Sequence, residues 1–293
     1  MLPLATTPTL RVAVVSIGRS GTSVISRILH EVLAVDFGDE ADHIPRNHNN
    51  PDGYFENREM LALNERILAA VNGAVLRPPA LEAFVTLDPD TKKTLIETVG
   101  ERINFYAASK PSFGWKDPRL SLTFPIWKAA VPNVVAVIAF RDPRAVMRSI
   151  ADQLDVAQTS LSGLWLDYYR RIFRDTAGCK RVVVSFDQLL DEPLRVVETM
   201  ATHLNIVIDK KTAERQLAGI VKPKQAKHRV DATVSKSELA LDPNTEAVYF
   251  YLRDAVAKNH QPDFEMLDRL LNPISEAAAQ PTLKRWWSSL IGR

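Results

Sequence analysis

The stretch Arg11–Leu29, RVAVVSIGRSGTSVISRIL, decides the fold of this 293-residue chain. Residues 11–17 are mostly apolar and β-branched and predict a buried strand. Residues 18–23, GRSGTS, predict a tight turn, and residues 24–29 predict the start of a helix. A strand that passes through such a turn into a helix N-terminus offers backbone N–H groups to an anion, most often a phosphate. We therefore expect an anion-binding loop directly after the first strand.

Further strands and helices alternate along the chain. Three more apolar segments, at residues 113–117, 133–140 and 180–186, predict strands, and the second is continuously apolar, as in a central parallel strand. This alternation implies βαβ units, so the predicted fold is α/β: a P-loop-type parallel sheet flanked by helices, with a helical C-terminal part. Helical patterns cover residues 59–71, 90–109, 118–130, 143 onward, 160–176, 194–204, 210–220 and 244–259.

The composition is that of a globular protein, and we expect a single domain over residues 1–293. A formal net charge of +2 gives no general attraction to nucleic acid. The single cysteine, Cys179, excludes an internal disulfide and fits a reducing compartment. Because we find no signal peptide and no run of ~20 apolar residues, we expect a cytoplasmic enzyme. The aromatic and basic tail at 283–291 could contact a membrane weakly, although docking on its own domain is favoured.

Residues 36–57 are polar and broken by prolines and glycines, and they predict a long loop. A loop of that length in a compact domain is usually functional. It contains His43 and His48 among carboxylates, but their spacing fits no compact ligand motif. We therefore expect no metal.

The turn at residues 18–23 departs from two common nucleotide-binding motifs. Thr22 stands where a Walker A loop has its lysine, which disfavours a kinase or nucleoside triphosphatase. The G-x-G-x-x-G dinucleotide motif is also missing, because the turn holds only Gly18 and Gly21. Its single arginine, Arg19, among amides and hydroxyls suits a smaller or differently charged anion than a triphosphate.

Several segments resemble those of sulfotransferases that use 3′-phosphoadenosine 5′-phosphosulfate (PAPS). GRSGTS at 18–23 resembles their 5′-phosphosulfate loop, and RDPRAVMRS at 141–149 resembles their 3′-phosphate element. WKDP at 115–118 is similar to the Lys-Asp-Pro segment of tyrosylprotein and bacterial sulfotransferases. FDQLLDEP at 186–193 resembles the signature after a later strand, and NPDGYFEN at 50–57 resembles bacterial members.

By these motifs the chain is identified as a member of the PAPS-dependent sulfotransferase family, of the bacterial type and with motif similarity to tyrosylprotein sulfotransferases. The similarity covers roughly residues 11–205, which leaves 206–293 as a helical extension. Physical sense supports the pairing of the two phosphate elements: Arg141 can contact a phosphate with two N–H groups, and Ser149 lies about two helical turns further on the same helix face. The residues implied to bind the nucleotide are Gly18, Arg19, Ser20, Gly21, Thr22, Ser23, Arg141 and Ser149.

The implied reaction moves the sulfuryl group from PAPS to a hydroxyl or amine, with a carbohydrate or small metabolite as the expected acceptor. Such an in-line displacement needs positioning, charge stabilisation and one base, and no metal. Arg19 and Lys116 are the expected catalytic cations, although Lys116 could instead be a surface lysine paired with Asp117. Sequence alone leaves two other functions open: a P-loop kinase or hydrolase, and a non-catalytic nucleotide-binding module.

The base should be a carboxylate or histidine near the acceptor. Glu40 resembles the catalytic glutamate of tyrosylprotein sulfotransferases in its Gly-acid-Glu setting and is the expected base. Glu56 is the second candidate. In the cytosolic animal enzymes of the family, a C-terminal segment with glycine and lysine completes the 3′-phosphate pocket, and we do not find this segment here. The basic segment 222–229 is either its substitute or a solvated face. The residues expected to contact the acceptor, which include the further candidate bases, are His43, His48, Tyr54 and Glu56.

Overall fold

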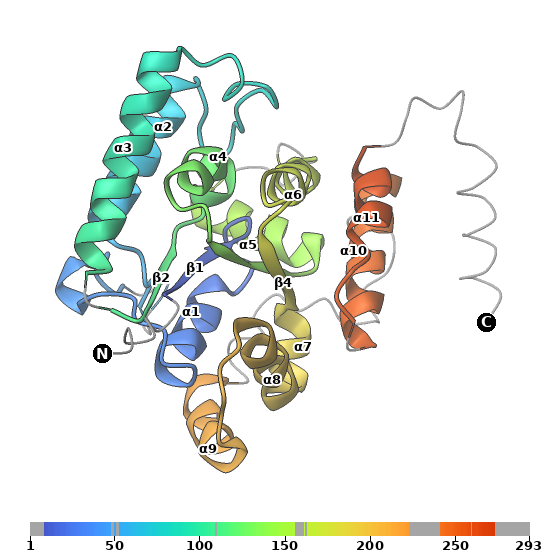
Figure 1. The fold of residues 1–293 in the computed structure, drawn as a ribbon. Helices are drawn as coiled ribbons and strands as arrows, with labels where there is room; N and C mark the ends of the chain where they lie inside the picture. The colour runs from blue at the N-terminus through green and yellow to red at the C-terminus, as the bar shows by residue number, and fades with distance from the viewer. Residues whose placement is uncertain are drawn as a thin grey trace.

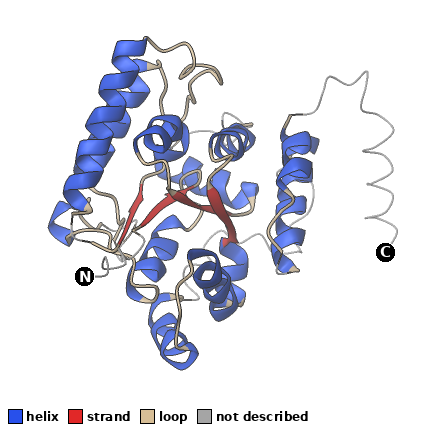
Figure 2. Ribbon diagram, in the orientation of Figure 1, coloured by secondary structure: helices blue, strands red, loops and turns tan. Residues whose placement is uncertain are grey.

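A four-stranded parallel sheet forms the centre of the protein. The computed structural model describes residues 9–47, 50, 53–108, 110–155, 161, 163–222, 241–258 and 260–272. The strand order is β2-β1-β3-β4, and helices cover both faces of the sheet (Figures 1 and 2). The predicted α/β class is therefore confirmed. The strands are β1 (Leu10–Val15), β2 (Ser112–Lys116), β3 (Val135–Phe140) and β4 (Lys180–Ser185).

The helices alternate with the strands up to β4 and then follow one another. Within the described ranges they are α1 (Thr22–Glu31), the short 3₁₀ helix η1 (Glu40–Asp42), α2 (Arg58–Ala70), α3 (Pro89–Tyr106), α4 (Leu120–Ala130), α5 (Pro143–Leu154), α6 (Leu164–Asp175), α7 (Phe186–Asp191), α8 (Pro193–Leu204), α9 (Lys210–Ile220), α10 (Pro243–Ala257) and α11 (Phe264–Leu271).

Each face of the sheet has its own hydrophobic core, because alternate residues of a strand point to opposite faces. Ala13 and Val15 of β1 pack with α2, α3, α4, α5, α6, α10 and α11. Val12 and Val14 pack on the other face, with α1, α7, α8 and α9. All six residues of β3 are buried, as predicted for a central strand. The carboxyl ends of the four strands meet at one edge, where open α/β sheets bind their ligands.

The predicted elements differ from the observed ones in three places. The strand predicted to reach Phe186 ends at Ser185, because the Ser185 hydroxyl accepts a hydrogen bond from the Gln188 N–H (3.3 Å) and caps α7, which the sequence analysis missed. Helix α11 was also missed, although Asp263 caps its first turn. The helix predicted from residue 160 begins as α6 only after Gly163, whose φ is 80°.

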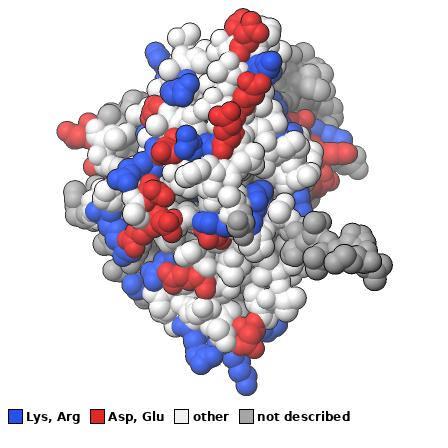
Figure 3. Space-filling model, turned by 60° about the vertical axis from the view of Figure 1, so that its left-hand side comes forward, with Lys and Arg blue, Asp and Glu red and all other residues white. Residues whose placement is uncertain are grey.

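Three predictions fall on residues outside the described ranges: the role of His48, most of the basic segment 222–229, and the tail 283–291. The extent of a single domain stays a prediction. In the part that the structure describes, each helix is too short or too polar to span a bilayer. On the face drawn in Figure 3, basic and acidic side chains are interspersed, in keeping with the small net charge.

Candidate active site

A cavity of about 640 Å³ opens at the carboxyl edge of the sheet. Each strand delivers part of its lining: the turn after β1, Lys116 at the end of β2, Arg141 directly after β3 and Phe186 directly after β4. Ser149 on α5 also lines it. Segments far apart in the sequence therefore meet at one site.

Hydrogen bonds to Ser121 of α4 hold the chain directly after β1, and Gly21 shapes the turn that follows. The Ser121 hydroxyl accepts from the Ser16 N–H and donates to the Ser16 carbonyl, both at 2.8 Å. Gly21 has φ 81°, and a Cβ there would overlap the ring of Phe186. No described side chain caps α1, so the N–H groups of its first turn, at Thr22 and Ser23 on the cavity wall, are available to an anion.

Two arginines and a serine form the second cluster. Arg19 Nε donates to Ser149 Oγ (3.0 Å), and Arg141 Nη1 reaches the Arg19 carbonyl (3.4 Å). The Arg141 guanidinium lies 5.1 Å from the centre of the Phe186 ring. Burial lowers the pKa of Arg141, Arg19 adds to that effect, and Asp187 opposes it. An anion bound here would offset the cost of burying this charge.

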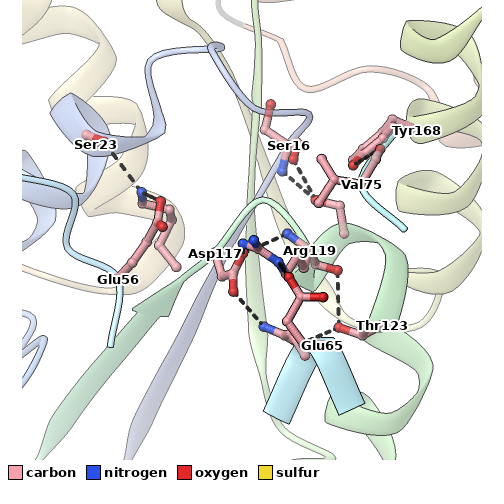
Figure 4. A network of polar contacts seen from close by, with 12 residues as sticks. Ser16, Ser23, Glu56, Glu65, Val75, Asp117, Arg119, Thr123 and Tyr168 are labelled. Carbon is pink, nitrogen blue, oxygen red and sulfur yellow. Dashed lines mark hydrogen bonds and ion pairs between the residues drawn. The ribbon is translucent and has the colours of Figure 1, made fainter. Parts of the chain in front are cut away.

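A buried ion pair forms the third cluster. Lys116 Nζ lies 2.5 Å from Glu56 Oε1, and the two side chains are only 2% and 11% exposed. Lys116 also donates to Ser23 Oγ (3.4 Å), which Asn50 Nδ2 approaches at 3.1 Å. Figure 4 shows Glu56 beside Ser23, at the start of α1. The second candidate base and the expected catalytic lysine thus contact each other beside the turn after β1.

Asp117 supports this edge from inside the protein (Figure 4). Its Oδ2 accepts from Asn64 Nδ2 (3.1 Å), and its Oδ1 accepts from the N–H (2.9 Å) and Nη1 (3.1 Å) of Arg119. Arg119 also pairs with Glu65. Burial raises the pKa of Asp117, the nearby Glu56 raises it further, and Arg119 lowers it. The alternative that Lys116 is a surface lysine paired with Asp117 is wrong, because Lys116 is buried against Glu56.

The structure brings most of the predicted site residues to this cavity. Ser20 is fully buried and does not line it. Asn50, Tyr168 and an apolar group around Val75 line it as well; only Asn50 fell in a quoted motif, and the aromatic pattern around Tyr168 pointed only to core packing. The predicted residues that do line the cavity are Gly18, Arg19, Gly21, Thr22, Ser23, Tyr54, Glu56, Lys116, Arg141 and Ser149.

Glu40 and His43, which were also predicted as site residues, lie outside this cavity. The Glu40 side chain is 71% exposed and pairs with Arg46 at 2.8 Å. His43 Nε2 lies 2.8 Å from the Phe37 carbonyl oxygen, and its ring lies against Phe55. Both line a second cavity of about 530 Å³ and not the one that holds Lys116. The physical reason is that Glu40 begins the exposed helix η1, whereas Glu56 lies just before α2, where its side chain is buried against Lys116.

The fold and this loop define an α/β protein with a phosphate-loop-type site at the carboxyl edge of its sheet. The family model described as "Sulfotransferase family" matches residues 11–210. The chain therefore belongs to the sulfotransferase family. Comparison with curated proteins gives no match.

Among solved structures, the chain is similar to the sulfotransferase domain of the Synechococcus PCC 7002 olefin synthase, with 14% identity over 100% of this chain and 98% of that one and a TM-score of 0.44. Sulfotransferase STF9 of Mycobacterium avium has 18% identity, coverage of 78% and 70%, and a TM-score of 0.45. Sulfotransferase STF1 of Mycobacterium tuberculosis H37Rv has 15% identity, coverage of 76% and 77%, and a TM-score of 0.43.

Proposed function

We propose that the protein transfers the sulfuryl group of PAPS to a hydroxyl acceptor, with Glu56 as the base. One observation carries this proposal: the two segments matched to the 5′- and 3′-phosphate elements, far apart in sequence, line one cavity and are joined by the Arg19–Ser149 hydrogen bond. A triphosphate site needs no second anchor of this kind.

The hydrogen-bond donors of the cavity fit a nucleotide with one phosphate group on the 5′ position and one on the 3′ position of its ribose. The turn and the N-terminus of α1 supply N–H groups for the 5′-phosphosulfate. Arg141, which is 5% exposed, and Ser149 supply the planar guanidinium and the hydroxyl for the 3′-phosphate. Arg19, between the two clusters, can contact either end.

The reaction itself is a displacement at sulfur. The acceptor oxygen forms a bond to sulfur, the bond between sulfur and the bridging phosphate oxygen breaks, and the electron pair stays on the leaving 3′-phosphoadenosine 5′-phosphate. Lys116 stabilises the negative charge that develops on the bridging oxygen of the leaving bisphosphate, since its Nζ lies at the turn after β1. Glu56, held by Lys116, accepts the proton of the acceptor hydroxyl.

A thermal-shift comparison of 3′-phosphoadenosine 5′-phosphate, ATP and NAD tests the proposal, because a ligand that binds the folded state stabilises it. We expect stabilisation by the bisphosphate, and loss of that shift in Arg141→Ala. Stabilisation by ATP alone would contradict the proposal and favour a kinase or hydrolase. Tight binding of the bisphosphate without turnover of PAPS on any acceptor would favour a non-catalytic module.

A further inference from the structure

The lining of the cavity also has an apolar part. Hydrocarbon side chains reach it from three segments: the loop before α2, α2 itself, and the segment between α2 and α3. These residues are Ile44, Leu61, Val75 and Leu76, and Tyr168 of α6 lines the same cavity.

This wall is built into the element that carries the proposed base. Leu61 lies one helical turn after Asn57, whose carbonyl accepts the Leu61 N–H (2.9 Å), and Glu56 directly precedes that turn. The Tyr168 hydroxyl donates to the Val75 carbonyl (2.9 Å) and fixes the next part of the wall. In Figure 4 the pair Val75 and Tyr168 lies on the other side of Asp117 and Arg119 from Glu56.

Leu76 marks the rim of this part. It is 42% exposed although it is a large apolar residue, and it lines the cavity. Leu154 of α5, 47% exposed, lines the same cavity. Two exposed leucines at the rim of one cavity gain from contact with an apolar ligand, because each still has hydrocarbon surface to remove from water.

Three polar side chains of the lining, those of Arg119, Tyr54 and Asn50, are already engaged within the protein. Arg119 pairs with Asp117 and Glu65. The Tyr54 hydroxyl donates to Asn47 Oδ1 (2.8 Å), and Asn50 Nδ2 donates to the Gly53 carbonyl (2.7 Å). A sugar ring placed against these three side chains and the apolar residues would give up hydrogen bonds to water and gain few from them in return, which disfavours its binding.

From this wall we infer that the acceptor is an alcohol or phenol on an apolar body. Of the two acceptor classes expected from sequence, a carbohydrate or a small metabolite, the inference selects the small metabolite. The inference rests on the proposed function. The hydrocarbon part lies against Leu61, Val75 and Leu76, and the hydroxyl points to Glu56. The hydroxyl proton passes to the Glu56 carboxylate as the new oxygen–sulfur bond forms and the bond to the bridging phosphate oxygen breaks.

Two hydroxyl-bearing probes, the aromatic 2-naphthol and the sugar N-acetylglucosamine, test the inference in two assays. The first assay measures sulfuryl transfer from PAPS. The second measures the thermal shift that each probe adds to the complex with 3′-phosphoadenosine 5′-phosphate, which requires no turnover. The loop between α2 and α3 supplies a matched pair of variants, because Leu81 is 41% exposed, as Leu76 is 42%, but does not line the cavity.

We expect 2-naphthol to be sulfated and to raise the melting temperature of the binary complex, and N-acetylglucosamine to do neither. Leu76→Gln should lower kcat/KM for 2-naphthol by about 10-fold, mainly through KM. Leu81→Gln should match the wild type, and both variants should keep the wild-type affinity for the bisphosphate.

Preference for N-acetylglucosamine in either assay, or equal effects of Leu76→Gln and Leu81→Gln, would overturn the apolar acceptor while leaving sulfuryl transfer intact. A chain that is not stabilised by 3′-phosphoadenosine 5′-phosphate at all would instead overturn the proposed function. The two failures are therefore distinguishable from the nucleotide titration alone.

Discussion

Replacing Glu56 by glutamine tests which of two carboxylates in the same loop, Glu56 or Glu40, is the base. Glu56 is 11% exposed and contacts Lys116 at 2.5 Å, whereas Glu40 is 71% exposed and pairs with Arg46. Loss of a general base costs about 10²–10⁴ in rate, which corresponds to about 3–5 kcal/mol of barrier. We expect Glu56→Gln to lose turnover by that factor. Glu40→Gln should keep turnover close to that of the wild type, because its exposed carboxylate lies outside the cavity.

The glutamine also removes the counter-charge of a buried lysine, so a loss of folding must be told from a loss of chemistry. Breaking a buried pair destabilises a protein by about 3–5 kcal/mol. Glu56→Asp keeps the charge but withdraws the carboxylate by one methylene, so it should fold better than Glu56→Gln and recover only part of the turnover. The melting temperature and the affinity for 3′-phosphoadenosine 5′-phosphate are measured for each variant.

The assay is release of 3′-phosphoadenosine 5′-phosphate from PAPS in the presence of 2-naphthol, with each variant at a temperature where it is folded. Turnover of Glu56→Gln within threefold of the wild type would refute the assignment of the base. If Glu40→Gln instead lost turnover by two orders of magnitude, Glu40 would be the base, and its loop would have to move toward the cavity during the reaction.

Three further substitutions probe the structure around the site. Gly21→Ala should abolish nucleotide stabilisation in a thermal-shift assay, since the residue adopts φ 81° and its Cβ would overlap the Phe186 ring. Lys116→Ala should destabilise the chain by about 3–5 kcal/mol in urea unfolding, because it leaves a buried carboxylate alone; a smaller loss than 1 kcal/mol would contradict the buried pair. Asp117→Asn should cost about 1–3 kcal/mol, because an amide has only one acceptor oxygen and its NH2 group then faces either the Asn64 donor or the Arg119 donors. Burial raises the pKa of the Asp117 carboxyl above its ordinary value, so the folded state binds the carboxyl proton more tightly than the unfolded state does. The free energy of unfolding of the wild type, relative to that of Asp117→Asn, should therefore fall as pH rises from about 4 in urea titrations. A difference that grows with pH would contradict the shift.

The regular elements of this fold follow from periodicity. The apolar runs predicted all four strands within two residues of their observed ends, because buried parallel strands need continuous apolar sequence. Asp142 and Pro143 marked the start of α5, where the Asp142 carboxylate accepts the Arg144 N–H (2.8 Å). The two segments that resemble phosphate elements, at 18–23 and 141–149, could be located because each follows the end of such a strand.

The long loop could not be predicted in the same way. Glu40 and Glu56 both lie in polar sequence without periodicity, and nothing local tells which side chain turns inward. The outcome depends on long-range contacts: the Ile44 N–H donates to the Glu56 carbonyl (2.8 Å), and Phe55 adopts φ 55°. The apolar wall at Val75 comes from an irregular segment and was missed for the same reason.

The central claim is that the cavity binds a nucleotide by both of its phosphate ends. Calorimetric titration with 3′-phosphoadenosine 5′-phosphate and with adenosine 5′-phosphate tests it directly, since the two ligands differ only in the 3′-phosphate. Charge-assisted hydrogen bonds contribute about 1.5–3 kcal/mol each, so we predict that the bisphosphate binds at least tenfold more tightly and that Arg141→Ala removes this difference. Equal affinity of the wild type for the two nucleotides would contradict the account.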